Sequence, residues 1–377
     1  MAATSHKRWG KARVVDVCEV AQHVRQVVLA PEQLDAPAPP GSHIDIGVYI
    51  HGRADVRSYS VVGSGAYGSE IILGVQLARQ SRGGSAFMHA LRRGQEVSIT
   101  QPLQNFPLNY GRPGYVLAAG GIGITALVGM GKALKARGAD YRFVYGARTR
   151  GLMAFLDELV GEHADRLDLR IDDEGSGMEV GELVASVPVG GELYVCGPTP
   201  MLDAIKAAWA AAGRKPAELR FETFGSSGRF APEPFTVRIP RLGMETTVPH
   251  DASMLEALEA SGADLMFDCR RGECGLCQVK VLDVQGVIDH RDVFLSDDQH
   301  KAGDRLQCCV SRIVSPNCRK PSKWPHAPSS RPVRRRRHSW GRAPIRSASS
   351  SVSGIGSSGA GFRFTSASTR RRSRRPP

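Results

Sequence analysis

The first third of the chain alternates short apolar runs with clusters of Gly, Pro and Ser. Six runs rich in Val and Ile follow one another between residues 12 and 107: "ARVVDV", "VRQVVLA", "HIDIGVYI", "RSYSVVG", "EIILGVQL" and "QEVSIT". Short strands at this spacing predict a small antiparallel β-barrel, and "SAFMHAL" predicts a short helix between the last two strands. We expect this barrel to occupy residues 1–110.

The rhythm changes near residue 112. Continuous apolar runs such as "GYVLAAGG", "YRFVYGA" and "ELYVCGP" alternate with helical stretches such as "MLDAIKAAWAAAG". This alternation predicts an α/β domain with a parallel sheet over residues 111–226. Ligands of such sheets bind beyond the carboxyl ends of the strands.

A Gly, Ser and Pro rich stretch, "GSSGRFAPEP", separates this domain from a smaller third unit. We expect a linker at 227–234 and an α+β domain at 235–316, because "FTVRIP" and "ETTVPH" predict a hairpin and "SMLEALEAS" predicts a helix. The predicted fold class is therefore multi-domain, with a barrel, a parallel α/β sheet and a small α+β unit.

Charge is distributed unevenly along the chain. Of the 50 Lys and Arg residues, 16 follow Cys318, where no Asp or Glu occurs; residues 1–318 then hold 34 basic and 37 acidic residues. The net charge of +13 therefore belongs to the last segment, and we expect residues 317–377 to form a disordered, low-complexity basic tail. A nucleic-acid binder acting through "RRRR" and "RRRSRR" is an alternative that this tail leaves open.

The sequence holds no run of about 18 apolar residues, and its first residues lack the apolar core of a signal peptide. We therefore expect no membrane span and a cytoplasmic location. Reducing conditions there keep thiols free, so clustered cysteines favour a metal site over disulfides.

Three cysteines lie within nine residues in "DCRRGECGLC". Cys269, Cys274 and Cys277 have the C-x4-C-x2-C spacing of plant-type 2Fe–2S sites, which need one more cysteine far downstream. Cys308 and Cys309 are the candidates for that fourth ligand. Zinc is the alternative, although zinc ribbons usually pair two C-x2-C knuckles.

Residues 234–316 resemble a plant-type ferredoxin domain, and residues 1–316 resemble the phthalate dioxygenase reductase family, which includes vanillate demethylase reductase. That family has the same order of flavin barrel, NAD domain and C-terminal β-grasp ferredoxin. In it the last cluster ligand precedes "VSR", which implies Cys309 as the fourth ligand. After "VSR" the family continues into a closing apolar strand, whereas here "PNCRKPSKWPHAP" follows.

The stretch "RSYS" resembles the R-x-Y-S flavin motif of this superfamily. The resemblance implies that Arg57 pairs with a flavin phosphate, that Ser58 and Tyr59 line the flavin site, and that Ser60 hydrogen-bonds flavin N5. The segment "RGGSAFMH" resembles the family's second flavin phosphate motif. The resemblance implies that Gly83, Gly84 and Ser85, at the start of a short helix, bind the flavin phosphate through backbone amides. The family uses FMN, and the residues themselves leave FAD open.

Three segments of the predicted nicotinamide domain resemble motifs of this superfamily. "AAGGIGITAL" is similar to a G-G-x-G-x-T turn, which implies that backbone amides meet the cofactor pyrophosphate. "YVCGPTPML" is similar to a C-G-P-x-x-M segment, which implies a cysteine beside the reacting nicotinamide carbon. "FETFG" matches the place of an aromatic residue over the flavin, either Phe224 or Phe221. The NAD and flavin contacts that these resemblances imply are Gly120, Gly121, Gly123, Thr125, Cys196, Gly197, Pro198 and Phe224. Separately, "YGARTR" places Arg148 and Arg150 after a central strand, where the adenosine part of the cofactor would lie.

Together these features indicate an NADH-dependent oxidoreductase, with Ser60 and Cys196 at the reacting atoms. Hydride from NADH reaches the flavin, single electrons pass to the 2Fe–2S cluster, and a partner protein accepts them. The resemblance implies a Rieske-type oxygenase of aromatic degradation as that partner. A different one-electron acceptor, such as a cytochrome, remains the alternative.

Overall fold

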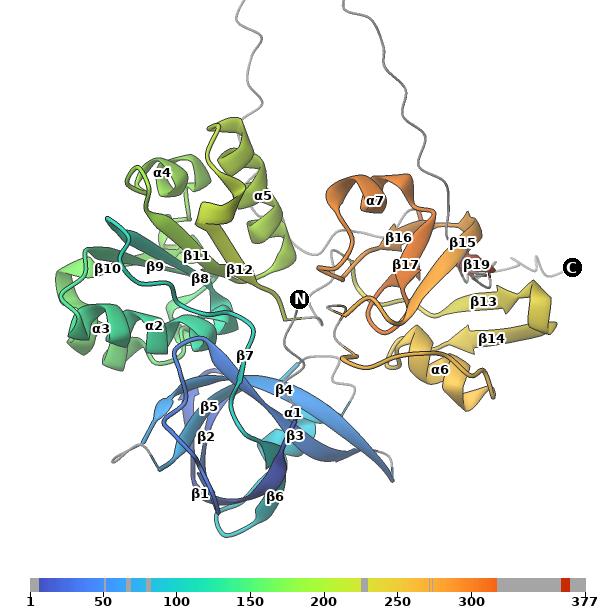
Figure 1. Cartoon of the computed structure of the whole chain (residues 1–377), viewed down its shortest axis with the longest axis horizontal. Coiled ribbons are helices and arrows are strands. Elements are labelled where there is room, and N and C mark those ends of the chain that lie inside the picture. The colour runs from blue at the N-terminus through green and yellow to red at the C-terminus, as the bar shows by residue number, and fades with distance from the viewer. Residues whose placement is uncertain are drawn as a thin grey trace, which may run out of the picture.

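A computed structural model describes residues 7–50, 52–65, 69–78, 83–224, 230–270, 272, 274–316 and 361–366. Figure 1 shows three units along the chain: a barrel in blue, an α/β unit in green, and a mixed unit in yellow and orange. Within the described residues, no helix is both long and apolar enough to cross a membrane.

The N-terminal unit is the expected antiparallel barrel. Six strands follow the order β4-β5-β2-β1-β6-β3, and pairing of β3 with β4 closes the ring. Apolar side chains such as Ile44, Ile46 and Leu73 fill its interior. Its elements are β1 (Trp9–Ala21), β2 (Val24–Pro31), β3 (Ser42–Ile50), β4 (Arg53–Ser64), β5 (Ile71–Gln76), α1 (Gly84–Ala90), β6 (Glu96–Thr100) and β7 (Leu103–Gln104).

The second unit is the expected parallel sheet, with strand order β10-β9-β8-β11-β12. The central strands β8 and β11 are buried along their whole length, as continuous apolar runs predict for a sheet covered on both faces. Its strands are β8 (Tyr115–Gly120), β9 (Tyr141–Ala147), β10 (Leu167–Ile171), β11 (Glu192–Cys196) and β12 (Leu219–Glu222). Its helices are α2 (Ile124–Ala136), α3 (Leu156–His163), α4 (Val180–Ala185) and α5 (Thr199–Ala211).

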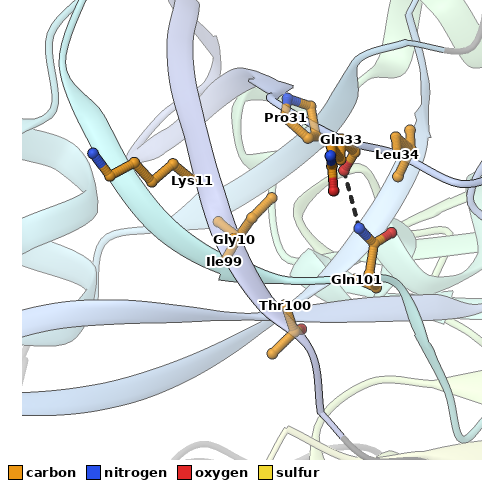
Figure 2. A pocket seen from close by; sticks show the side chains of 8 residues that line it. All are labelled: Gly10, Lys11, Pro31, Gln33, Leu34, Ile99, Thr100 and Gln101. Atoms are coloured by element: carbon orange, nitrogen blue, oxygen red, sulfur yellow. Dashed lines mark hydrogen bonds between the residues drawn. The ribbon is translucent and has the colours of Figure 1, made fainter.

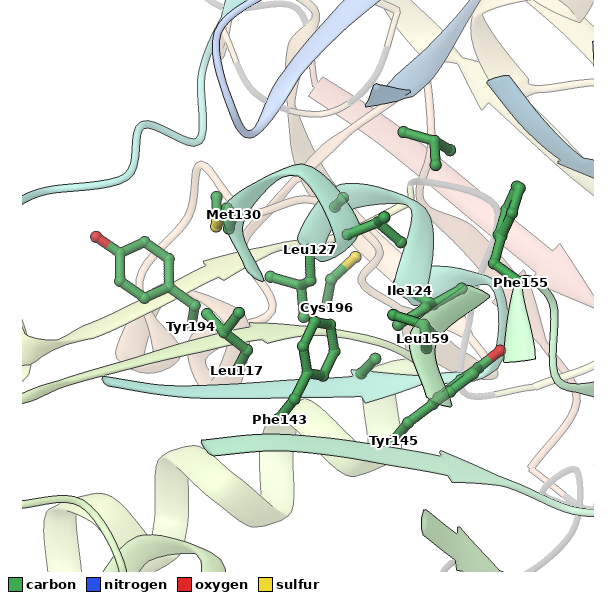
Figure 3. Packing of buried hydrophobic residues seen from close by; sticks show 14 of the residues in the cluster. Leu117, Ile124, Leu127, Met130, Phe143, Tyr145, Phe155, Leu159, Tyr194 and Cys196 are labelled. Carbon is green, nitrogen blue, oxygen red and sulfur yellow. The ribbon is translucent and has the colours of Figure 1, made fainter. Parts of the chain in front are cut away.

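Two apolar clusters hold the helices to opposite faces of this sheet. One joins the sheet to α2 and α3 and includes Leu127, Phe143 and Tyr145, which lie close together in Figure 3. The other includes residues of α4 and α5, such as Leu183 and Ile205. The sheet is therefore rigid on both sides, and its carboxyl edge can hold side chains in fixed positions.

The barrel and the sheet meet along α2 and β5. A Cβ added to Gly74 of β5 would lie 2.7 Å from Thr125 Cγ2 and 2.9 Å from the ring of Phe155. The amide of Gln22 donates to the carbonyl of Gly151 at 2.9 Å. Because Thr125 begins the helix after β8, this contact brings the carboxyl edge of the sheet against the barrel.

The third unit holds two small sheets. A five-stranded sheet has the order β14-β13-β19-β15-β17, and β16 pairs separately with β18. The expected hairpin forms from β13 and β14, and a capping box at Ser253 begins the expected helix α6. The elements are β13 (Phe235–Ile239), β14 (Met244–Val248), α6 (Met254–Ala260), β15 (Gln278–Gln285), β16 (Val287–Asp289), α7 (Asp297–Ala302), β17 (Arg305–Gln307), β18 (Arg312–Val314) and β19 (Gly361–Ser366).

Strand β19 corrects the expectation of a structureless tail over residues 317–377. It pairs antiparallel with β13 and parallel with β15, so it is the central strand of the sheet. Phe362 and Phe364 are each 1% exposed and stack with ring centroids 6.2 Å apart. Alternation of Phe with Arg and Thr in "GFRFTS" gives one apolar face, which is what a strand needs over a core. The rest of the predicted tail, 317–360 and 367–377, lies outside the described residues.

Candidate functional site

Arg57 lies on β4, where it faces the start of α1. Its Nη1 is 2.7 Å from Asp55 Oδ2, and a Cβ added to Gly84 would lie 2.7 Å from Arg57 Nε. The two predicted phosphate-binding segments are therefore neighbours in the fold. The ion pair with Asp55 leaves most of the guanidinium donors available for a phosphate, since guanidinium has five N–H groups.

The neighbouring residues of β4 differ in their surroundings. Ser58 donates its hydroxyl hydrogen bond to Asp45 Oδ1, a buried carboxylate that also pairs with Lys7. Tyr59 is half-buried against the barrel core, and burial raises the pKa of its phenol to about 12. The Tyr59 ring is therefore neutral and apolar on its flat face, which suits stacking on a flavin.

The second predicted phosphate segment forms helix α1. Gly83 is its first flanking residue, and its carbonyl accepts from the Phe87 amide at 2.8 Å. The Ser85 hydroxyl accepts from the Ala78 amide at 3.1 Å. Ser85 thus ties the start of the helix to the segment after β5.

The glycine turn after β8 packs on the segment that follows β11. A Cβ on Gly120 would lie 2.6 Å from Met201 Sδ and 2.7 Å from Pro198 Cδ, while one on Gly123 would overlap the Cys196 carbonyl. Glycine is needed at both positions because the turn after β8 packs closely on the segment after β11. A Cβ added to Gly121 meets nothing within 4 Å, so Gly121 is the member of the turn that a cofactor can approach.

Thr125 and Gly197 complete this packing. The Thr125 hydroxyl is buried and donates to the Ile122 carbonyl at 2.9 Å, which stabilises the start of α2. A Cβ on Gly197 would lie 2.8 Å from Met201 Sδ and 3.1 Å from Gly120. Two motifs that stand some 75 residues apart therefore form one surface at the carboxyl edge of the sheet.

Ser60, Cys196 and Glu222 come together where the barrel meets the sheet. Cys196 and Glu222 end the neighbouring strands β11 and β12 as direct partners. The Ser60 hydroxyl on β4 is 3.4 Å from Glu222 Oε2. Burial, and then the nearby Glu222 carboxylate, raise the pKa of the Cys196 thiol well above its usual value. Cys196, which is labelled in Figure 3, is therefore a neutral thiol within a packed cluster.

Glu222 was not among the predicted site residues. Its only signal in the sequence is its place in "FETFG", which drew attention to the aromatic residues on either side. Its position becomes evident only once β12 is paired with β11.

The structure distinguishes the two aromatic candidates of that segment. Phe224 packs against the apolar cluster that contains Cys196, on the α2 side of the sheet. Phe221 packs against the opposite cluster, with Lys206 Nζ 4.1 Å above its ring. Phe224 therefore lies on the side of the sheet that meets the barrel.

Arg148 follows β9 at an exposed position, where it interacts electrostatically with Asp172. Arg150 makes a two-bond pair with Glu174, at 2.9 and 2.7 Å. The Asp173 amide donates to the Arg148 carbonyl at 3.1 Å. Positive charge at this end of the sheet is thus balanced by the acidic turn Asp172–Glu174.

The cysteine loop has a backbone suited to wrapping around a compact group. Gly272 and Gly275 have φ values of +77° and +78°, which favour glycine, and Arg270 has φ +51°. Arg270 is held in place by Glu259, with Nη2 3.0 Å from both carboxylate oxygens. A side chain on Gly275 would overlap the Phe294 ring, so the loop packs tightly on the segment before α7.

The cysteine thiols lie close enough to interact. Hydrogen bonds from Cys308 and then Cys309 lower the pKa of the Cys277 thiol well below its usual value. The Cys277 thiolate in turn raises the pKa of both donors. Cys309 also interacts with Cys269 and with the Gly272 backbone, whereas Cys308 is fully buried. Cysteine sulfurs gathered in this way, with the Gly272 backbone beside them, fit the ligand set of an iron–sulfur cluster.

A separate hollow on the barrel does not involve these residues. Figure 2 shows it between β1, β2 and β6, lined by Lys11, Leu34 and Gln101 among others. Its volume of about 10 Å³ is room for one water at most. It is not a cofactor site.

Comparison with known proteins agrees with this arrangement. Residues 237–314 match the family model described as a 2Fe-2S iron-sulfur cluster binding domain. The chain is 38% identical to the phenoxybenzoate dioxygenase subunit beta of Ectopseudomonas oleovorans, over 73% of this chain and 85% of that protein. It is 33% identical to the vanillate O-demethylase oxidoreductase of a Pseudomonas strain, over 77% and 92%. It resembles the solved structure of phthalate dioxygenase reductase at 27% identity and a TM-score of 0.63, covering 81% of this chain and 96% of that one.

Proposed function

Because the chain belongs to the phthalate dioxygenase reductase family, we propose that it passes electrons from NADH through FMN and a 2Fe–2S cluster to a Rieske-type oxygenase of an aromatic compound. Relatives named as a dioxygenase subunit and an O-demethylase oxidoreductase support the oxygenase as acceptor. The cluster-binding domain match supports the last carrier. When bound, the flavin converts a two-electron hydride donor into a source of single electrons.

The observation that carries the proposal is the meeting of Ser60, Cys196 and Glu222. Ser60 belongs to the predicted flavin barrel, and the other two belong to the predicted nicotinamide domain. Hydride transfer needs the two rings to be held face to face within a few ångströms. A contact between the two domains at these three residues is the place where the chain can provide that.

Each of the three side chains has a distinct part in this scheme. The Ser60 hydroxyl rotates freely enough to donate either to Glu222 or to a flavin nitrogen, since it carries one proton and two lone pairs. The neutral Cys196 thiol excludes water without reacting, because thiolate is the nucleophilic form. The Glu222 carboxylate offers acceptors for a carboxamide or for the Ser60 proton.

Phe224 supports the same site from the end of β12. Its position on the Cys196 side of the sheet fits a ring that covers the flavin until nicotinamide replaces it. Arg57, Tyr59 and the start of α1 would hold the phosphate and ring of the flavin, and Gly121 would face the NADH pyrophosphate. Cys269, Cys274, Cys277 and Cys309 would ligate the cluster.

The test uses the purified full-length chain. Its visible spectrum is expected to contain flavin and 2Fe–2S bands together, the released flavin is expected to be FMN, and anaerobic NADH is expected to bleach both bands. The protein is then combined with Rieske-type oxygenase components. Reduction of the Rieske centre and formation of the hydroxylated product are measured in this mixture.

The matched control is Cys309→Ser. This variant is expected to keep NADH-driven ferricyanide reduction, which the flavin supports directly, and to lose Rieske reduction. Rieske reduction at the original rate by a variant without the cluster would contradict the proposed route. Reduction of a cytochrome but of no Rieske component would replace the proposed acceptor.

A further inference from the structure

Two histidines and an aspartate form a buried cluster beside the cysteine loop. His290 and Asp292 follow β16, and His300 lies on α7. The Asp292 side chain is fully buried, and those of His290 and His300 are 10% and 22% exposed. His300 Nε2 lies 3.1 Å from Asp292 Oδ2, and His290 Nδ1 lies 3.7 Å from Asp292 Oδ1.

The polar atoms of this cluster differ in whether they have a hydrogen-bond partner. Both ring nitrogens of His290 are buried and have no hydrogen-bond partner among the described residues. Buried nitrogens without a protein partner are rare, and a bound cation is one kind of partner that can satisfy them. Its ring instead stacks on His300, with centroids 4.4 Å apart and planes 25° from parallel.

Asp292 is held in its ionised form. Burial alone would raise the pKa of Asp292, but its interactions with His290, His300 and the Leu295 amide outweigh burial and hold the pKa well below its usual range. The carboxylate accepts from the Leu295 amide at 2.9 Å, and the Ser311 hydroxyl lies 3.4 Å away. A carboxylate offers about four acceptor sites, so a bond to a cation is compatible with these contacts.

From this arrangement we propose that His290, Asp292 and His300 bind one divalent transition-metal ion of the zinc class. Two imidazoles and a carboxylate are the ligand set that zinc accepts, with water in the fourth position. One ligand atom from each residue lies within 4.8 Å of the other two. Three atoms within 4.8 Å of one another are each at most about 2.8 Å from a common central point. Zinc–ligand bonds are about 2.0–2.2 Å long, so each ligand atom would move toward the ion by less than about 1 Å.

The ion fixes the segment that supports the cysteine loop. A Cβ on Gly272 would lie 2.9 Å from Asp292 Cα, and the Val293 amide donates to the Gly272 carbonyl at 3.1 Å. Ser311, two residues after Cys309, reaches the same carboxylate. A cation at Asp292 therefore joins α7 to both ends of the cluster-binding region and slows loss of the cluster.

The experiment titrates Zn²⁺ into the chelator-treated holoprotein, with intact iron–sulfur absorbance checked throughout. We expect one zinc per chain, measured by calorimetry and elemental analysis, and slower bleaching of the cluster in air when zinc is bound. His300→Gln is expected to weaken zinc binding by at least about 100-fold, since even outer-shell changes cost 10- to 100-fold. His250→Gln, which removes an exposed histidine of the same domain, is expected to bind zinc normally.

Several results would overturn the site. One is a holoprotein that binds no zinc, and another is a His300→Gln variant that binds it as tightly as the original chain. Zinc that binds only as iron is released occupies the cysteines and also counts against the site. If His300→Gln lowers stability, His290→Gln gives a second measurement, and retained cluster absorbance shows that the domain is folded.

Discussion

Replacing both phenylalanines of β19 by alanine tests whether the end of the chain holds the ferredoxin domain together. Phe362 faces Val281 across the parallel pair with β15, and Phe364 lies between Val237 of β13 and Val284 of β15. Both rings belong to the core that also contains Cys277, Cys308 and Cys309. We therefore expect Phe362→Ala/Phe364→Ala to unfold this domain and release the cluster.

Comparing the cost of the substitutions with the stability of the ferredoxin domain shows whether the domain is only destabilised or unfolds. Truncating a buried Phe to Ala costs about 3–5 kcal/mol. The two rings are neighbours in one core, with centroids 6.2 Å apart. Their effects therefore add incompletely, and the double change costs about 4–9 kcal/mol. A domain of about 90 residues is stable by about 5–13 kcal/mol. The double change therefore removes most or all of the free energy of unfolding, whereas Phe364→Ala alone lowers the melting temperature by about 12 °C or more.

The assay compares iron per chain and the thermal loss of cluster absorbance. NADH-driven ferricyanide reduction reports on the barrel and the parallel sheet, and we expect it to be unchanged. A chain ending at Ser366 keeps β19 and serves as the matched control, expected to behave like the full chain. The reasoning would be refuted by a double variant that keeps its iron and melts within about 2 °C of the original.

Three further predictions concern the cofactor sites. Cys309→Ser should abolish the cluster, while Cys308→Ser should keep its iron; iron analysis giving the reverse would exchange their roles. Arg57→Ala should weaken flavin binding by about 10- to 150-fold, as loss of a charge-assisted hydrogen bond of about 1.5–3 kcal/mol predicts, and an unchanged dissociation constant would remove Arg57 from the site. The chain should prefer NADH, and a higher kcat/KM of the original chain for NADPH would contradict this assignment. Glu174→Gln should raise kcat/KM for NADPH about 2- to 5-fold, because it frees Arg150 to bind the 2′-phosphate.

The barrel and the parallel sheet could be predicted because their patterns are local. The runs that became β1 to β6 are short, β-branched and bounded by turn residues, and the buried strands β8 and β11 are continuous apolar runs. Strand β19 escaped this reasoning because its six residues lie within a segment dominated by Arg and Ser. Its place between β13 and β15 depends on contacts more than 70 residues distant in the sequence, which no local pattern contains.

The candidate site was predictable only in part for the same reason. Motifs identified Ser60 and Cys196 separately, but Glu222, which lies between them, carries no motif of its own. The histidine cluster is a similar case, because His290 and His300 meet each other and Asp292 only through the packing of α7 on the segment after β16. Residues that act together across elements become visible once pairing and packing are known.

The chain between the sheet and the ferredoxin domain sets how far the two can separate. Phe224 packs on the sheet, and the Phe230 carbonyl accepts from Arg291 Nη2 at 3.1 Å, within the ferredoxin domain. The chain from Phe224 to Phe230 spans at most about 20–22 Å when fully extended. A tether this short gives an effective concentration in the millimolar range. Electron transfer within the chain is therefore first order and insensitive to dilution, whereas transfer to the oxygenase is second order and slows as the proteins are diluted.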